Sequence, residues 1–180
     1  MKNVIIIIGI IGLSLITSCT KEPSLQKYFV DHQNDAEFIA VDIPSSLLSK
    51  ETIKLTEEEQ EALESIKKIN FLALPLNGDN QSRFEKEQAA IKKIIASDDY
   101  ESLMRFNFHG IKAILKYQGE DDDIDEAIIF ATHQEKGLAL LRILGDNMKP
   151  EKIAVLMQSI EKGKINIEAL KKLENTIELN

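Results

Sequence analysis

The sequence predicts an α+β domain in which helices pack on a mixed β-sheet. Two observations support this class. Apolar residues recur every three or four positions in some segments and every second position in others, as expected for helices and strands respectively. The predicted elements follow the order strand, helix, strand, helix, four strands and two helices, after one short helix at the start. Capping, turn and strand-ending residues mark each of them.

The first two strands are expected to pair in parallel. A short helix is predicted at 24–33, followed by a strand at 38–43 that Pro44 ends. A second strand is predicted at 69–75. The first two crossovers are about 25 residues each, which is long enough to join parallel neighbours through right-handed connections.

Two capping boxes begin the helices within these crossovers. In a capping box, each of two side chains bonds to the backbone of the other residue. Thr56 with Glu59 predicts a helix that ends near Lys68, and Ser82 with Glu85 predicts a second amphipathic helix. The buried stripe of the second helix is expected to contain Phe84, Gln88, Ile91 and Ile95.

Four strand-like runs with short turns between them predict an antiparallel meander. Met104, Phe106 and Phe108 share one face of the first run, because alternate residues of a strand point to the same side. The turn after this run contains Gly110, which can supply a positive φ. The four runs are 101–108, 111–118, 127–133 and 138–144.

Two C-terminal helices are expected after the meander. Residues 145–147 form a turn, and Pro150 suits the first turn of a helix. Gly163 ends that helix, and Asn166 can cap a final one. The final helix would carry Leu170 and Leu173.

Composition and charge exclude several functions. The 180 residues include 22 basic and 30 acidic ones, so the formal net charge is −8. A phosphate backbone would be repelled, and we expect no nucleic-acid partner. The single cysteine excludes an internal disulfide and a cysteine-rich zinc site.

Residues 1–18 are predicted to be a secretory signal peptide. A short segment with one positive charge precedes 4–16, which is apolar and uncharged. As a helix, 4–16 would be about 20 Å long, shorter than the ~30 Å hydrocarbon core of a bilayer. A retained membrane anchor and a buried N-terminal helix are the alternatives.

The segment Ile16-Thr17-Ser18-Cys19 resembles the lipobox of bacterial lipoproteins. The resemblance implies cleavage before Cys19, which would carry palmitate and a second acyl group on its new amine. Two or more acyl chains anchor a protein stably. The alternative is that Cys19 is a small residue near an ordinary cleavage site.

We therefore expect a lipid-anchored protein of the cell envelope, organised as a signal peptide at 1–18, a tether at 19–23 and one domain at 24–180. Loss of Lys2 with the signal peptide changes the net charge from −8 to −9, so lipid rather than charge must bind the membrane. No aspartate follows Cys19, which favours the outer membrane. The domain could face the periplasm or the cell surface.

The acidic run 120–126 is the first segment that suggests chemistry. Counted as a calcium-binding loop from Asp121, it has Glu126 in place of the required glycine and Thr132 in place of the bidentate glutamate. We therefore interpret the run as a solvated turn, with weak calcium binding as the alternative.

The histidines and one polar row are the other candidates. His32, His109 and His133 are far apart in the sequence and lack zinc-ligand spacing, although the last two could approach in space. Arg105, Asn107 and His109 lie together on the outward face of the first meander strand and could contact a partner. The alternative for this row is a solvated sheet face. No catalytic residue, metal site or cofactor is predicted, because no local catalytic motif is present.

Four groups of residues carry a family resemblance: Phe38-x-x-Val41-x-Ile43, Tyr100-Glu101-x-Leu103-Met104, Lys116-Tyr117-x-Gly119-Glu120 with Ile124-x-Glu126, and Leu140-Leu141-x-Ile143-x-Gly145-Asp146. Together with the lipobox, they resemble the domain-of-unknown-function family 4252. The resemblance implies a short bacterial lipoprotein, and a possible link to envelope stress or signalling. It brings no catalytic or ligand-binding residue.

Two functional classes follow from these observations. The favoured class is a noncatalytic module that binds or senses an envelope component, such as a protein partner. The alternative is an envelope hydrolase whose catalytic residues are scattered along the sequence.

Overall fold

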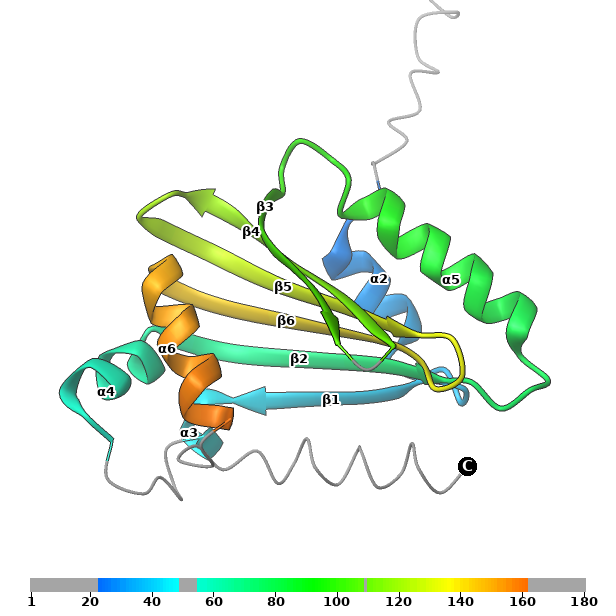
Figure 1. Ribbon diagram of the computed structural model, residues 1–180, viewed down its shortest axis with the longest axis horizontal. Coiled ribbons are helices and arrows are strands. Elements are labelled where there is room, and N and C mark those ends of the chain that lie inside the picture. Colours follow the sequence, from blue (N-terminus) through cyan, green and yellow to red (C-terminus); the bar gives the residue numbers. More distant parts are fainter. Residues whose placement is uncertain (1–22, 49–54, 109, 162–180) are drawn as a thin grey trace, which may run out of the picture.

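The computed structural model describes residues 23–48, 55–108 and 110–161 (Figure 1). The strands form one six-stranded sheet in the order β1-β2-β6-β5-β4-β3, which confirms an α+β fold. In chain order, the elements are α2 (Leu25–His32), β1 (Ile39–Pro44), α3 (Ser45–Leu48), α4 (Glu57–Glu64), β2 (Ile66–Pro75), α5 (Gln81–Ile94), β3 (Glu101–Phe108), β4 (Ile111–Glu120), β5 (Asp123–His133), β6 (Gly137–Met148) and α6 (Pro150–Glu161).

The sheet is antiparallel throughout, so the prediction of a mixed sheet with parallel crossovers is wrong. The reason lies in α4, which ends at Glu64 rather than near Lys68. Its eight residues span about 12 Å, whereas the six residues of β1 span about 20 Å. Ser65 alone separates α4 from β2. The chain therefore re-enters the sheet at the end where β1 left it.

The strands β3, β4, β5 and β6 pair in sequence order, as predicted. Gly110 follows β3 with a φ of +81°, also as predicted. The prediction that 145–147 ends the sheet is wrong. Strand β6 continues to Met148 through Asn147, which adopts a positive φ of 51° beside a register shift against β5.

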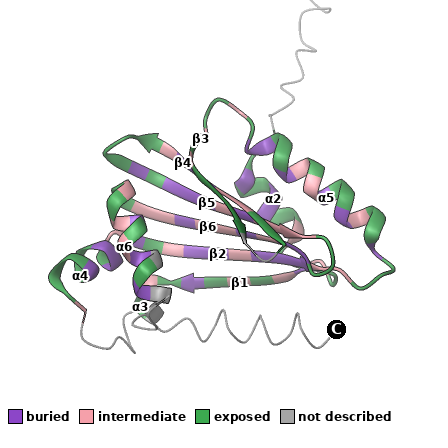
Figure 2. Ribbon diagram, viewed as in Figure 1, coloured by how far each residue is buried: buried purple, intermediate pink, exposed green. Residues whose placement is uncertain are grey.

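Helices cover both faces of the sheet because its central strands are apolar on both sides (Figure 2). Helices α2 and α5 pack on one face, and α4 and α6 pack on the other. The α2–α5 core includes Leu25, Leu72, Ile91, Phe130 and Leu140. The α4–α6 core includes Ile43, Leu63, Ile69, Ile143 and Leu156.

The predicted capping box of α4 is present. The Thr56 hydroxyl accepts a hydrogen bond from the Glu59 N–H at 3.2 Å, and the Glu59 carboxylate accepts one from the Thr56 N–H at 2.8 Å. We expect Thr56→Ala to lower the free energy of unfolding by about 1 kcal/mol, because it leaves an N-terminal N–H of the helix without a partner. Denaturant unfolding measures this, and Ser82→Ala is the matched control.

The second predicted capping box, Ser82 with Glu85, is not formed, so Ser82 is a suitable control position. Helix α5 begins two residues earlier than predicted, with Asn80 rather than Ser82 as its N-cap. The Asn80 side chain does not cap the helix. Instead, its oxygen accepts from the Asn77 N–H at 3.1 Å and its nitrogen donates to the Pro75 carbonyl at 2.9 Å. Ser82→Ala should therefore change stability little. A loss equal to that of Thr56→Ala would contradict the assignment.

Helix α6 confirms the helix predicted from Pro150. Several predictions fall outside the described residues: the signal peptide, the lipobox with Cys19, most of the tether, Gly163, Asn166, and the final helix with Leu170 and Leu173. Within the described part of the chain, every helix is too short or too polar to cross a membrane.

Candidate binding groove

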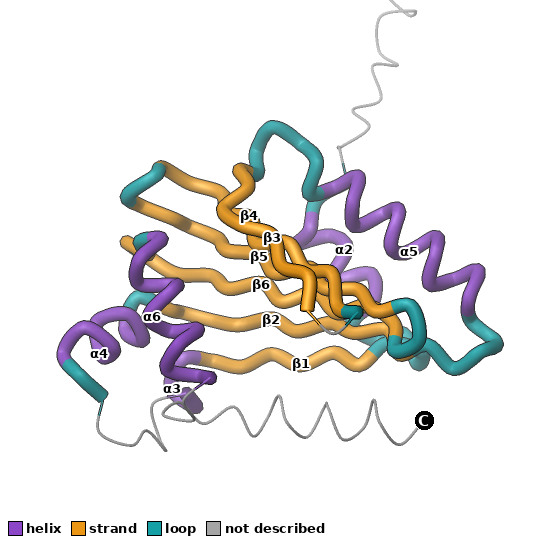
Figure 3. The backbone as a smooth tube through the Cα atoms, in the orientation of Figure 1, coloured by secondary structure: helices purple, strands orange, loops and turns teal. Residues whose placement is uncertain are grey.

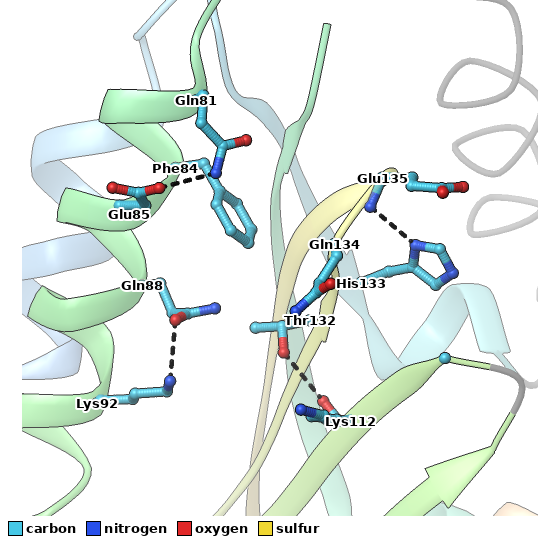
Figure 4. Close-up of a pocket in the computed structure, with 11 residues that line it drawn as sticks. Gln81, Phe84, Glu85, Gln88, Lys92, Lys112, Thr132, His133, Gln134 and Glu135 are labelled. Atoms are coloured by element: carbon cyan, nitrogen blue, oxygen red, sulfur yellow. Dashed lines mark hydrogen bonds between the residues drawn. The ribbon is translucent and has the colours of Figure 1, made fainter. Parts of the chain in front are cut away.

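A groove of about 850 Å³ lies between α5 and the ends of β4 and β5 (Figure 4). Its volume falls within the roughly 300–1,000 Å³ that is usual for ligand sites. The side chain of Phe84 on α5 contributes to its lining but is only 6% exposed, so the accessible groups are mainly polar.

One wall of the groove is the polar side of α5. Gln81, Glu85, Gln88 and Lys92 recur at helical spacing, next to the buried stripe that faces the sheet. Gln81 donates a hydrogen bond to the Glu85 carboxylate at 2.9 Å, and Lys92 donates one to the Gln88 amide oxygen at 2.9 Å. These bonds orient alternating amide and charged groups along the wall.

The other wall is formed by the ends of β4 and β5. The Thr132 hydroxyl donates to the Lys112 carbonyl at 3.4 Å. The Nδ1 atom of His133 accepts hydrogen bonds from the backbone N–H groups of Glu135 and Lys136, at 3.1 and 3.3 Å. Because Nδ1 accepts in this geometry, Nε2 is the ring nitrogen left to donate. A Cβ added to Gly110 would lie 3.0 Å from that nitrogen, so the imidazole packs closely on the β3–β4 turn.

The groove is polar without an excess of charge. Two carboxylates, Glu85 and Glu135, balance two ammonium groups, Lys92 and Lys112. The bonds described above join Glu85, Lys92 and His133 to amides or to the backbone. General acid–base catalysis instead needs titratable groups placed to exchange protons with a substrate. The arrangement offers hydrogen-bond donors and acceptors to a polar ligand without net charge.

One of the three predicted contact residues, Asn107, lies next to this groove. Arg105 and Asn107 are exposed on β3, and Asn107 pairs with Lys112 of the groove wall. His109 lies outside the described residues. Neither Arg105 nor Asn107 lines the groove itself, so the proposed contact role of the row stays a prediction.

The groove was not predictable from the sequence of α5, whose pattern indicates only a buried stripe and a solvent-exposed remainder. Gln88, which was expected in that stripe, is half-buried and lines the groove, whereas Glu87 is 4% exposed and belongs to the core. The one available signal was the second helical stripe of Gln81, Glu85 and Lys92. From the sequence alone, this stripe cannot be distinguished from an ordinary solvent-exposed helix face. Only the position of the sheet opposite shows that it lines a groove.

Buried Glu87 joins α5 to α2. Its carboxylate accepts a hydrogen bond from the Tyr28 hydroxyl at 2.8 Å and lies 3.3 Å from Nε2 of His32. Burial, and then Glu87 itself, raises the pKa of Tyr28. Arg83 extends the cluster by bonding to Asp35 and Glu37. The Asp35 pKa is held below its usual value by the backbone N–H of Glu37 and then by Arg83. These interactions fix α2 against α5.

A second buried cluster lies beyond the C-terminal end of α5, on the same face of the sheet. Arg142 of β6 donates to the Glu126 carboxylate of β5 at 2.5 Å, and only 14% and 5% of the two side chains are exposed. Tyr100 donates to Glu126 at 3.4 Å, and burial followed by the Glu126 charge raises its pKa to about 12. Lys116 of β4 donates to the Ile95 carbonyl, and burial lowers its pKa. This cluster ties the central strands together.

The acidic run 120–126 contributes both to the surface and to this core. Asp121, Asp122, Asp123 and Asp125 are exposed. Asp121 accepts a hydrogen bond from the Tyr117 hydroxyl at 2.7 Å. Within the described residues, no three His, Cys, Asp or Glu side chains are placed to hold a metal ion.

The protein is therefore an α+β domain that carries a polar groove on one face of its antiparallel sheet. The model of the family described as Domain of unknown function (DUF4252) matches residues 28–156, from α2 into α6. The chain belongs to this family, which confirms the resemblance stated above. No curated protein and no solved structure matches the chain.

Proposed function

We propose that the protein is a noncatalytic binding module, held at the cell envelope by lipid on Cys19, and that the groove beside α5 holds its ligand. The observation that carries this proposal is the groove itself, with a volume of about 850 Å³, balanced charges and side chains oriented by amides and backbone. The signal-like segment and the lipobox-like residues 16–19 support the location, with the outer membrane as the proposed site. The bound component would be a polar molecule or protein segment without net charge.

The anchor can be tested separately from the groove. We expect Cys19→Ala to abolish labelling by a palmitate analogue and to release the protein from membranes, because two or more acyl chains supply the membrane affinity. Labelling in the native host, followed by fractionation, measures both effects. Lys27→Ala, which lies beyond the tether, is the control and should keep the label. Labelling that persists in Cys19→Ala would refute the anchor.

The groove can be tested by site-specific photo-crosslinking in the native host. A photoreactive amino acid at Gln88 or Thr132 should yield the same cross-linked product from either wall. Lys112→Glu should reduce this product at least fivefold, because it unbalances the charge of the groove. The control position is Gln60, which is exposed on α4 across the sheet. A product that also forms at Gln60, or no product at Gln88 and Thr132, would contradict the proposal.

The alternative class, an envelope hydrolase, predicts a different result. The purified protein would turn over a cell-wall or phosphoester substrate, and Glu85→Gln or Glu135→Gln would abolish that turnover. A binding module should show no turnover that depends on either carboxylate.

A further inference from the structure

The face of the sheet that carries α4 and α6 is covered by described helices at one end of the strands only. Figure 3 shows α3, α4 and α6 gathered at that end. Away from them, Met104, Phe106 and Ile111 are 41%, 36% and 41% exposed. Met104 and Phe106 pair with Leu115 and Ala113, so all three side chains lie on this face. We call these three residues the open apolar surface.

The open apolar surface continues across the sheet as a row of laterally paired residues. From β3 to β1 the row is Phe106, Ala113, Ala131, Ala139, Ala73 and Ile39. The four inner positions of the row are all alanine; Ala113, Ala131 and Ala139 are half-buried and Ala73 is fully buried. Five inter-strand spacings of about 4.8 Å make the row about 24 Å long.

We propose that residues 162–180 of this chain cover the open apolar surface. Helix α6 crosses the same face and ends at Glu161 near α3, which follows the C-terminal end of β1 (Figure 1). Ile39, the β1 residue of the alanine row, begins the same strand, and the five residues 162–166 are enough to bridge the roughly 16 Å between the two ends of β1. With Asn166 as its N-cap, a final helix over 167–180 would contain fourteen residues and span about 21 Å at the helical rise of ~1.5 Å per residue. This length matches the row, so the segment can run back beside α6 from β1 to β3.

The sequence of 162–180 has the pattern that this position requires. At a helical period, Ile167, Leu170, Leu173 and Ile177 fall on one side. Lys172 and Asn175 fall on the opposite side. Gly163 allows a sharp turn directly after α6.

The spacing between α6 and the alanine row suits a second helix packed beside α6. Packed helices lie about 8–10 Å apart, which corresponds to about three residues along a strand. Ala139 is four residues from Ile143, which packs in the α4–α6 core.

Hydroxyl-radical footprinting of the full chain carrying Cys19→Ser tests this proposal. We expect the double variant Leu170→Asp/Leu173→Asp to raise the oxidation rates of Met104 and Phe106 at least threefold, since both side chains lose their cover. The matched control is Lys172→Asp/Asn175→Asp, which puts the same residues on the other side of the segment and should leave both rates unchanged. Met148, which is 1% exposed, reports whether the core stays folded.

A disulfide test needs no disruptive substitution. In the Cys19→Ser chain, Phe106→Cys should form an intramolecular disulfide with Ile177→Cys, which lies nearest the β3 end of the row, and not with Asn175→Cys on the opposite side of the segment. Equal oxidation of Met104 and Phe106 in the parent and in Leu170→Asp/Leu173→Asp would overturn the proposal, as would no preference among the disulfides. A parent dimer that Phe106→Asp separates and Leu170→Asp/Leu173→Asp leaves intact would also overturn it, and would assign the surface to a second copy.

Discussion

Replacing Glu126 with alanine is expected to lower the free energy of unfolding by about 3–5 kcal/mol. Removing one member of a buried ion pair leaves the other charge without a partner in a low-dielectric site. Here Arg142 would lose the carboxylate that lies 2.5 Å away, while its Nε is already buried with no hydrogen-bond partner. The hydroxyl of Tyr100 would lose its acceptor as well. Equilibrium unfolding in urea measures the change.

The double variant Glu126→Leu/Arg142→Met is the control for this prediction. Replacing both members of a buried pair by apolar residues of similar size is often neutral or stabilising. The double variant should therefore be more stable than Glu126→Ala and lie close to the parent. If the single variant costs less than about 1 kcal/mol, the pair is hydrated in solution and our account of this cluster is wrong.

Gly137→Ala is expected to destabilise the protein by about 3 kcal/mol or more. Gly137 begins β6 with a φ of +110°, which L-residues rarely adopt. A Cβ there would also lie 2.1 Å from the Leu74 carbonyl oxygen and 2.8 Å from the Leu76 nitrogen. Relieving this overlap requires β2 and β6 to separate at Pro75 and Gly137, the last pair of the ladder between these two strands. Thermal and denaturant unfolding of the purified variant measure the loss.

Gly78→Ala separates backbone strain from the overlap. Gly78 has a φ of +84°, but a Cβ at this position would have no neighbour within 4 Å. Its cost should be only the strain of a left-handed alanine, about 1–2 kcal/mol. Equal losses in the two variants would mean that the close approach of β2 and β6 at Gly137 is not maintained in solution.

Local features were predictable from the sequence where neighbouring residues determine them. The capping box of Thr56 and Glu59, the turn at Gly110 and the helix from Pro150 depend on contacts within a few residues. The prediction of parallel crossovers was wrong because the length of a connection allows either strand direction. The point at which α4 ends decides between the two directions, and the sequence between Glu64 and Lys68 does not mark that end.

Buried charges were the main features that the sequence could not reveal. Glu87 and Glu126 lie in segments whose pattern assigns them to solvent, and both are buried because a distant Tyr, His or Arg completes their hydrogen bonds. The groove was hidden for the same reason, since its walls are more than 15 residues apart in sequence. Only the pairing of β5 with β6 and the packing of α5 bring Gln88 near Thr132.

The position of α2 limits how far the protein can act from a membrane. Leu25, the first residue of this helix, is fully buried, and Glu87 secures the helix to α5. If Cys19 is the lipid attachment point, the five residues 19–23 extend at most about 18 Å. The domain would then stay next to the bilayer surface. Any molecule that it captures must itself come within a few nanometres of the lipid headgroups, which favours ligands embedded in or attached to the same membrane.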